Sequence, residues 1–431
     1  MPKVLVLGGY GLIGSACCRA LLAEGFDVRA IGRSESAARQ SGLQVEWLFA
    51  DLALANSAEW NRLVDGVDVV VNAAGALQDG LRDNLDAIHD RAVAAMVQAL
   101  AGTHTRIVQI SAAGVSPDAP TEFLRSKARG DARVASSGLD WVILRPTLVI
   151  SHAAYGGTAL LRAVAALPLI SVRILSHSTV QTVWVGDLAQ AVVDAASDRI
   201  EAGTIADLTE AGSRSFAETV LLFRRWLGLP EWKRSIDLPR VVVAPLGRIA
   251  DLLGWLGWRS PLRGNALRSL ESGITGDPGP WLSAGGRPCR SLEDTLVLVP
   301  ASVQERWFAR MYLLLPLSIA ILSLFWICSG LIALVQPDRS AAVLTERGVG
   351  AGLATGVALI GGMLDVMLGF ALLVRRWTVK AASGMIAVSA AYLLGSAAFA
   401  PDLWLDPLGP MLKVLPSLPL ALIVAALMDE R

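Results

Sequence analysis

The chain has 431 residues, and 38 basic side chains balance 38 acidic ones, so its formal net charge at pH 7 is zero. Charged residues make up only 18% and hydrophobic residues 53% of the chain, against about 25% and 45–50% in ordinary soluble domains. This balance excludes a basic nucleic-acid binder and a mainly disordered chain. The four cysteines and four histidines show no metal-ligand spacing, so we expect neither a metal site nor a nucleic-acid partner.

The N-terminal half alternates short β-rich runs with Ala- and Leu-rich helical stretches. The predicted strands are Lys3–Leu7, Asp27–Ile31, Val67–Val71, Arg106–Ile110 and Trp141–Ile143. Such alternation is typical of βαβ units that build a parallel sheet covered by helices on both faces. We therefore predict a doubly wound α/β domain of the Rossmann type over residues 1–225.

A glycine-rich loop joins the first predicted strand to the first predicted helix. Its residues are Gly8, Gly9, Tyr10, Gly11, Leu12, Ile13 and Gly14, which form a GxxGxxG spacing. In a strand–turn–helix, such glycines allow a tight turn, let the backbone approach a pyrophosphate and let the helix pack closely on the strand. The same glycines interrupt the apolar N-terminal run, which argues against a secretory signal peptide. We predict that this loop binds a dinucleotide.

The end of the second predicted strand indicates which dinucleotide binds. An Asp or Glu at this place holds the ribose 2′-hydroxyl of NAD, whereas an Arg accommodates the 2′-phosphate of NADP. The strand is followed by Gly32 and Arg33, with no acid. Arg33 therefore predicts NADP, with NAD and a merely solvated arginine as the alternatives.

Together these residues resemble the extended and atypical short-chain dehydrogenase/reductases over roughly residues 3–215. GxxGxxG is the glycine loop of that branch, and Leu144-Arg145-Pro146 and Val183–Ala189 look like its later landmarks. The resemblance implies that Asp51 and Leu52, after the third strand, contact the adenine. It also implies that Ala73, Ala74 and Gly75 lie along the cofactor, and that Ser111 stands in the active site.

The family's catalytic tyrosine is missing. In the family it stands four residues before a lysine that lowers its pKa and holds the ribose; here Lys127 is present but Phe123 replaces the tyrosine. A phenyl ring has no ionisable hydroxyl, so acid–base catalysis at position 123 is impossible. Tyr155 or His152, in the loop after the sixth strand, could substitute, although either could equally be structural. Ser111 and Lys127 remain the candidate catalytic residues.

Two functions therefore stay open. The chain could be a membrane-tethered NADP(H)-dependent reductase of a lipophilic acceptor such as a quinone or a lipid. It also resembles the NmrA-like sensors and the accessory subunit of respiratory complex I, which implies a non-catalytic NADP(H)-binding sensor or assembly factor.

The C-terminal region is apolar over lengths that suit a bilayer. The runs Met311–Pro337, Gly348–Val374 and Ala381–Pro401 reach the roughly 20 residues that a span needs, and Val414–Met428 is shorter. Helices buried in a soluble core rarely stay apolar all round for so long. We predict an all-α, four-helix transmembrane domain over residues 303–431. Residues 303–428 resemble the DoxX-like membrane family, which occurs fused behind reductase-like domains in bacteria.

The basic residues near the predicted spans indicate the topology. Arg306, Arg310, Arg375, Arg376, Lys380 and Arg431 would lie on one side, against Arg339, Arg347 and Lys413 on the other. The excess on the first side predicts that both termini and the Rossmann domain are cytoplasmic, in a multi-pass protein of the bacterial inner membrane.

Residues 226–302 connect the two domains and interleave tryptophans with basic residues. The set comprises Trp226, Trp232, Trp255, Trp258 and Trp281 with Lys233, Arg234, Arg240, Arg248, Arg259, Arg263 and Arg268. This composition suits a membrane interface, but the segment could also be the substrate lobe of the reductase. Within the spans, Asp365 is either a proton or ligand site or a hydrogen-bonding contact between helices.

Overall fold

The computed structural model describes residues 1–80, 84–258 and 264–429. These residues form two compact units, one of Met1–Asp251 with Ser260–Ala309 and one of Leu252–Arg259 with Arg310–Arg431. Of the basic residues predicted in the connector, Arg259 and Arg263 lie outside the described part.

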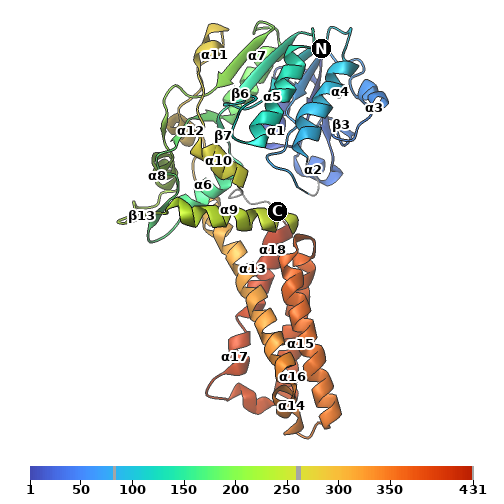
Figure 1. The fold of residues 1–431 in the computed structure, drawn as a ribbon, viewed down its shortest axis with the longest axis vertical. Helices are drawn as coiled ribbons and strands as arrows, with labels where there is room; N and C mark the ends of the chain where they lie inside the picture. Colours follow the sequence, from blue (N-terminus) through green and yellow to red (C-terminus); the bar gives the residue numbers. More distant parts are fainter. Residues whose placement is uncertain (81–83, 259–263, 430–431) are drawn as a thin grey trace. The chain divides into compact units, whose positions relative to one another are not determined.

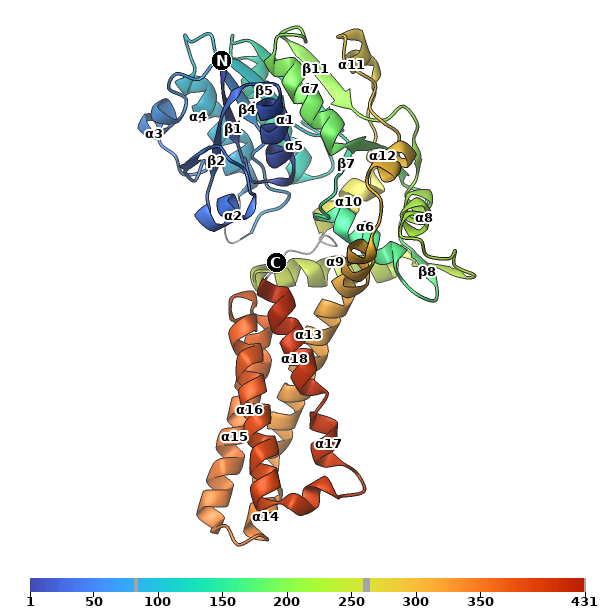
Figure 2. The same cartoon turned by 180° about the vertical axis from the view of Figure 1, so that it is seen from behind.

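The first unit is built on a parallel sheet with helices on both faces (Figures 1 and 2). Its seven described strands are β1 (Lys3–Leu7), β2 (Asp27–Gly32), β3 (Glu46–Phe49), β4 (Val69–Asn72), β5 (Arg106–Ile110), β6 (Trp141–Pro146) and β11 (Thr204–Leu208). They lie in the order β11-β6-β5-β4-β1-β2-β3. This order reverses between β1 and β4, and a Rossmann fold binds its ligand at such a point. The predicted fold class is confirmed.

Alternate residues of β1 face two separate hydrophobic cores. Val4 and Val6 pack with α1 (Leu12–Ala23) and α7 (Val185–Ala196), whereas Leu5 and Leu7 pack on the other face. The second face is covered by α3 (Ser57–Leu63), a π-helical turn η1 (Ala87–Arg91), α4 (Ala92–Ala99) and α5 (Glu122–Ala135). The remaining helix beside the sheet is α2 (Glu35–Gln40). Because both faces are covered, the strands are nearly continuous apolar runs, as the sequence shows.

Shorter elements complete the first unit. They are β7 (Leu148–Ile150), α6 (Gly157–Ala165), β8 (Ser171–Arg173), β9 (Thr179–Val180), β10 (Thr182–Trp184), β12 (Arg214–Ser215), α8 (Phe216–Trp226), β13 (Ser235–Asp237), α9 (Arg240–Trp255), α10 (Gly264–Glu271), α11 (Gly279–Ser283) and α12 (Leu292–Leu298). Strand β13 pairs with β8, so part of the predicted connector adds a strand to the sheet domain's C-terminal half.

A buried carboxylate, Glu210, ties α12 to this body. Its Oε1 accepts hydrogen bonds from the backbone N–H and hydroxyl of Thr182, at 2.8 and 2.7 Å, and from Arg214 at 2.8 Å. Its Oε2 accepts from Arg214 and from the N–H of Leu292, both at 2.9 Å. Only 1% of Glu210 is exposed, and both carboxylate oxygens receive their hydrogen bonds from protein groups, as a buried carboxylate requires.

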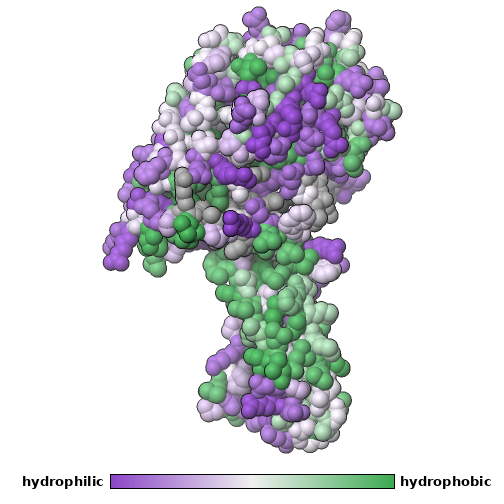
Figure 3. Space-filling model, in the orientation of Figure 1, coloured by the Kyte–Doolittle hydropathy of each residue, from purple (hydrophilic) through white to green (hydrophobic). Residues whose placement is uncertain are grey.

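The second unit is a helical bundle with a largely hydrophobic surface (Figure 3). Its elements are α13 (Val303–Val335), which begins in the first unit, α14 (Pro337–Thr345), α15 (Ala351–Leu373), η2 (Arg375–Trp377), α16 (Thr378–Phe399), η3 (Pro401–Trp404), α17 (Pro410–Val414) and α18 (Ser417–Asp429). In the described part, four helical segments are long and apolar enough to span a bilayer: Val303–Val335, Ala351–Leu373, Arg375–Phe399 and Pro410–Met428.

Small residues bring α13 and α15 together. A Cβ added to Gly330 would lie 2.4 Å from the carbonyl oxygen of Gly362, and the Ser323 hydroxyl donates to the carbonyl of Gly369 at 2.8 Å. Asp365 is 7% exposed and accepts a hydrogen bond from the Tyr392 hydroxyl of α16 at 3.2 Å. Close backbone approach and interhelical hydrogen bonds are the usual means of holding apolar helices together in lipid.

We predict that Glu210→Ala destabilises the first unit strongly. Removing the carboxylate leaves the partly buried Arg214 guanidinium and the Leu292 N–H without this acceptor, and breaking a buried ion pair costs about 3–5 kcal/mol. The apparent unfolding temperature of the purified protein should fall by on the order of 10 °C. The matched control is Glu293→Gln, because Glu293 also pairs with Arg214, at 2.9 Å, but its side chain is 53% exposed. Equal decreases in the unfolding temperature of the two variants would contradict the conclusion that the buried Glu210 carboxylate stabilises the first unit.

Candidate cofactor-binding and catalytic site

The glycine loop makes a tight turn against the ends of β2 and β4. The N–H groups of Gly8 and Gly9 both donate to the carbonyl of Ile31 at 3.0 Å. Gly8 has φ +75°, a left-handed conformation that favours glycine. A Cβ at Gly14 would lie 2.2 Å from the carbonyl oxygen of Gly8. The loop therefore requires glycine at both ends of the motif.

The start of α1 is suited to an anion. The first i→i−4 hydrogen bond runs from the N–H of Ser15 to the carbonyl of Gly11 at 2.9 Å. The N–H groups of Leu12, Ile13 and Gly14 come before it, and the first N–H groups of a helix have no acceptor within the helix. Together with the helix dipole, they form the kind of site that binds a pyrophosphate. The residues present thus fit a dinucleotide.

The turn after β4 lies directly against the glycine loop. A Cβ at Gly8 would lie 3.0 Å from both the carbonyl oxygen of Ala73 and the Cα of Ala74. The N–H of Ala74 donates to the side chain of Asn72 at 3.2 Å, which fixes the turn. Ala73 and Ala74 therefore lie directly against the glycine loop.

Asp51 and Leu52 differ in what their side chains do. The Asp51 carboxylate accepts from the N–H of Ala53 at 3.1 Å, so it caps the turn after β3. Leu52 is 6% exposed and belongs to the hydrophobic core with Leu7 and Trp60. The Leu52 side chain is therefore not available to a ligand at this edge.

Phe123 and Lys127 both lie on α5, one turn apart. The Lys127 ammonium is 5.7 Å from the centre of the Phe123 ring, and it donates to the carbonyl of Ile110, at the end of β5, at 2.9 Å. A Cβ at Gly75 would be 4.0 Å from this ammonium. Lys127 is 8% exposed, and burial lowers its pKa to about 8 although Asp131 opposes the shift. The lysine thus lies beside the β4 turn with a pKa close to physiological pH.

Ser111 belongs to a buried network that the sequence did not predict. Its hydroxyl donates to Oδ2 of Asp131 at 2.8 Å, and Arg145 donates to the same oxygen at 2.9 and 3.1 Å. Asp131 is 4% exposed, and burial raises its pKa despite the hydrogen bond from Ser111 and the nearby cations Arg145 and Lys127. Within the described part, its Oδ1 has no hydrogen-bond partner. The spacing Lys127-x-x-x-Asp131, which places both on one helix face, was the available signal.

His89 is a second residue that sequence reasoning missed. It lies in η1, is 3% exposed, and its Nε2 accepts from the N–H of Ala76 at 3.2 Å. Since Nε2 is an acceptor, Nδ1 carries the proton and donates to the Ser126 hydroxyl at 2.9 Å, which in turn donates to the carbonyl of Phe123 at 3.0 Å. Burial, then Lys127 and Arg129, lower the pKa of His89 to about 2. A neutral His89 therefore links the β4 turn to α5.

The two predicted substitutes for the tyrosine make other contacts. The His152 ring meets Trp184 edge-on at 5.2 Å, and its carbonyl accepts from Arg162 at 3.1 Å. Tyr155 is 56% exposed in the loop before α6. Among the described residues, no hydrogen bond joins either side chain to Ser111 or Lys127.

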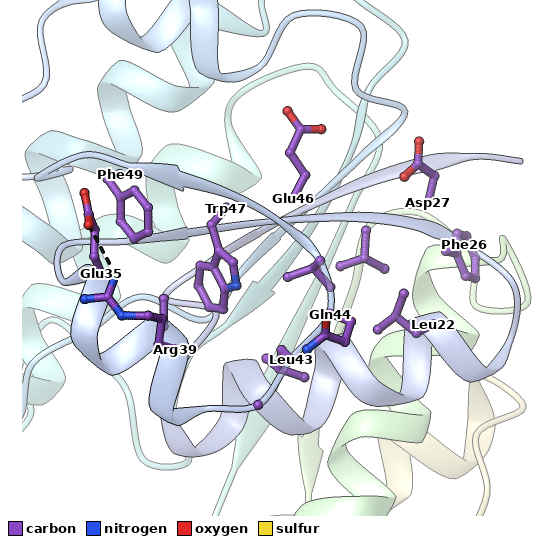
Figure 4. Close-up of a pocket in the computed structure, with 14 residues that line it drawn as sticks. Leu22, Phe26, Asp27, Glu35, Arg39, Leu43, Gln44, Glu46, Trp47 and Phe49 are labelled. Atoms are coloured by element: carbon purple, nitrogen blue, oxygen red, sulfur yellow. Dashed lines mark ion pairs between the residues drawn. The ribbon is translucent and has the colours of Figure 1, made fainter.

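A separate groove lies at the β3 edge of the sheet. It has a volume of about 720 Å³ and is bordered by α2 and the strands β2 and β3 (Figure 4). Trp47 and Phe49 line it together with the ion pair of Glu35 and Arg39, whose charged atoms are 3.6 Å apart. Within the described part, no residue of the glycine loop lines this groove.

The sheet order and the glycine loop define a domain with a Rossmann fold, and apolar helices follow it. Residues 8–167 match the model of an NAD(P)H-binding family, and residues 323–422 match the model of the DoxX-like family. The chain thus combines an NAD(P)H-binding domain with a C-terminal DoxX-like domain. No curated protein sequence matches it.

Solved structures with the same fold include nucleotide-binding enzymes. WbmH of Bordetella bronchiseptica, solved with NAD+, is 20% identical, with a TM-score of 0.51 over 70% of this chain and 97% of its own. UDP-glucose 4-epimerase of Thermotoga maritima, solved with UDP-glucose, is 13% identical, with a TM-score of 0.53 over 72% and 99%. Pal of Bacillus thuringiensis is 15% identical, with a TM-score of 0.53 and the same coverage. At these identities the likeness shows the fold.

We predict that His89 makes the stability of the first unit depend on pH below about 6.5. At a pH between the folded-state pKa of about 2 and the ordinary value of 6.5, His89 is protonated in the unfolded chain but neutral in the folded chain. Stability from this residue therefore falls as the pH is lowered, by up to about 1.4 kcal/mol per pH unit. Thermal unfolding from pH 7.5 to 5 should show a steeper decline for the wild type than for His89→Gln.

The control for this experiment is His104→Gln, because His104 is exposed. It should follow the wild-type pH dependence. Parallel curves for the wild type and His89→Gln would show that His89 is not held neutral.

Proposed function

We propose that the chain is a membrane-tethered NADP(H)-dependent oxidoreductase that reduces a lipophilic acceptor, a quinone or a lipid. The observation that carries this proposal is the buried Lys127, beside the turn that packs on the glycine loop, with a pKa lowered to about 8. A buried cation with a shifted pKa in a ligand site is typical of acid–base chemistry.

The residues divide the work of binding. Backbone groups of Gly8–Gly14 hold the pyrophosphate at the start of α1. Arg33 binds the 2′-phosphate. Asp51 and the backbone of Leu52 lie beside the adenine. Ala73, Ala74 and Gly75 lie along the part of the cofactor that extends towards Lys127. The bound nicotinamide supplies a hydride to the acceptor.

Lys127 supplies the proton in place of the missing tyrosine. An acceptor carbonyl that gains a hydride must also gain a proton to become a hydroxyl, and the ammonium of Lys127 releases one near pH 8. Phe123 closes this side of the site with an apolar ring. The Ser111 hydroxyl donates a hydrogen bond to Asp131, so in this proposal the proton for the acceptor carbonyl comes from Lys127 and not from Ser111.

A second function is favoured by one observation. The Ser111 hydroxyl donates its hydrogen bond to Asp131, and Phe123 has no hydroxyl, so neither of these two positions supplies the neutral donor that the family uses. A protein that binds NADP(H) and reports its level, or that assembles a membrane complex, needs only the binding half of this arrangement.

We further propose that residues 1–225 form the cofactor domain, 226–302 a connector at the membrane interface, and 303–431 the membrane domain. Support comes from the end of α9, within the second unit. The Trp258 indole donates to the carbonyl of Leu373 at 2.7 Å, and the N–H of Arg375 donates to the carbonyl of Leu256 at 3.1 Å. Leu373 ends a candidate span, and Trp255, three residues from Trp258, is 76% exposed. An exposed tryptophan beside basic residues suits lipid head groups.

We predict that the full-length protein oxidises NADPH with a soluble quinone analogue. If the Lys127 ammonium is the acid, kcat/KM should be constant below about pH 8 and fall about tenfold per pH unit above it. Lys127→Met should lower kcat by about 10²–10⁴-fold and remove this pH dependence. The control is Arg125→Met on the same helix, whose guanidinium instead bonds Glu122 and the carbonyl of Ala119.

Binding without turnover would decide between the two functions. Tight NADPH binding with no oxidation across a panel of quinones and lipid carbonyls supports the sensor. An absence of NADPH binding contradicts both.

We predict a cytoplasmic C-terminus. In a bacterial host, alkaline phosphatase fused after Arg431 should be inactive, because the enzyme needs the periplasm. The same reporter inserted after Leu405, between the third and fourth candidate spans, should be active. The reverse pattern would place the Rossmann domain outside the cytoplasm and contradict the positive-inside assignment.

A further inference from the structure

Tyr10 occupies the place where a dinucleotide-binding fold normally carries its acid. Its ring lies over Gly32, the last residue of β2, so closely that a Cβ on Gly32 would be 2.1 Å from Cε1 and 2.6 Å from Cδ1 of the ring. The ring centre is 6.1 Å from that of Trp47 on β3. The Tyr10 side chain thus extends from the glycine loop and packs against β2 and β3.

The hydroxyl of Tyr10 is held in a defined position. It accepts a hydrogen bond from the backbone N–H of Arg33 at 3.0 Å. Because this bond uses a lone pair of the oxygen, the hydroxyl's own proton must point elsewhere, and within the described part it donates to no protein acceptor. A phenol so held presents a donor at the end of β2.

An acid at this edge is sterically excluded. NAD-specific folds bind the ribose 2′-hydroxyl with a carboxylate at the end of the second strand. Here the residue is glycine, and the volume that a side chain would need is filled by the Tyr10 ring. The same place offers an O–H donor and, next in sequence, an exposed arginine.

From this geometry we propose that Tyr10 determines the choice of cofactor. Its hydroxyl, fixed by the N–H of Arg33, donates to the 2′-phosphate of NADP(H), and its ring keeps an NAD-type carboxylate out. This inference rests on the proposed NADP(H)-dependent function and assigns a role to a residue that glycine-loop spacing leaves unspecified.

The first test removes only the hydroxyl. Tyr10→Phe in the full-length protein should raise the Kd of NADPH about 10-fold, since hydrogen bonds to charged groups are the strong ones. The Kd of NADH should change by less than about twofold, because NADH has no 2′-phosphate. Calorimetry with both nucleotides gives the ratio, which a general packing defect would not change. Arg39→Gln, at an exposed arginine outside the loop, is the control and should leave both constants unchanged.

The second test concerns the ring. Gly32→Asp alone should lower the unfolding temperature and weaken the binding of both nucleotides, because its Cβ overlaps Tyr10. The double variant Tyr10→Ala/Gly32→Asp should regain the unfolding temperature and prefer NADH. Tight NADH binding by the single Gly32→Asp variant would overturn the steric part of the proposal.

Arg33→Glu separates this inference from the proposed function. If Arg33→Glu shifts preference towards NADH but Tyr10→Phe does not, Tyr10 has no role and the NADP(H) assignment stands. A wild-type protein that binds NADH in preference to NADPH, or neither nucleotide, overturns both.

Discussion

The close packing of the glycine loop on three strand ends is the constraint on which the site depends. With 2.2 Å between the position of a Cβ on Gly14 and the carbonyl of Gly8, α1 can lie this near β1 only without a side chain there. That approach leaves the first N–H groups of α1 pointing out of the sheet edge. It also brings Ala73 and Ala74 against Gly8 and lets Tyr10 reach across to Gly32. The proposed positions for the pyrophosphate, the nicotinamide side and the ribose thus all depend on this close packing.

At the other end of the candidate site, beside α5 and the end of β5, several charged side chains are buried away from water. Lys127, Asp131 and Arg145 are all partly or fully buried. Asp131 accepts three hydrogen bonds on one oxygen, while its other oxygen has no partner among the residues that the structure describes. An unsatisfied buried carboxylate oxygen is costly, and such costs cluster where a ligand completes the network. His89 stays neutral beside these charges, so it orders the backbone of Ala76 without adding a third cation.

The local features were predictable and the long-range pairings were not. The strand, glycine loop and helix from Lys3 to Ala23 follow from periodicity and glycine spacing over 20 residues, and the Lys127 position follows from a family motif. The partners of Ser111 could not be read in the same way, because Asp131 and Arg145 come from α5 and β6 and meet only once the sheet order is set. His89 lies in a π-helical turn that propensity does not reveal. The fourth apolar run, Val414–Met428, was weaker in sequence because it is short; in the structure α17 precedes α18, and the candidate span extends over Pro410–Met428.

Different interactions hold the elements of the two units together, because one is folded in water and the other has the apolar helices of a membrane domain. In the first, water drives apolar side chains into cores on both faces of the sheet, and the buried Glu210 carboxylate has hydrogen-bond partners on both oxygens. In the bilayer that drive is absent between helices, so association depends on contact distance and hydrogen bonds. Gly330 and Gly362 allow the close backbone contact, and Tyr392 and Asp365 form a hydrogen bond between helices. Asp365 thus has a packing partner in Tyr392, whereas the buried Lys127 ammonium contacts the backbone at the end of β5. Under the proposed function, the proton chemistry therefore belongs to Lys127 and the sheet edge.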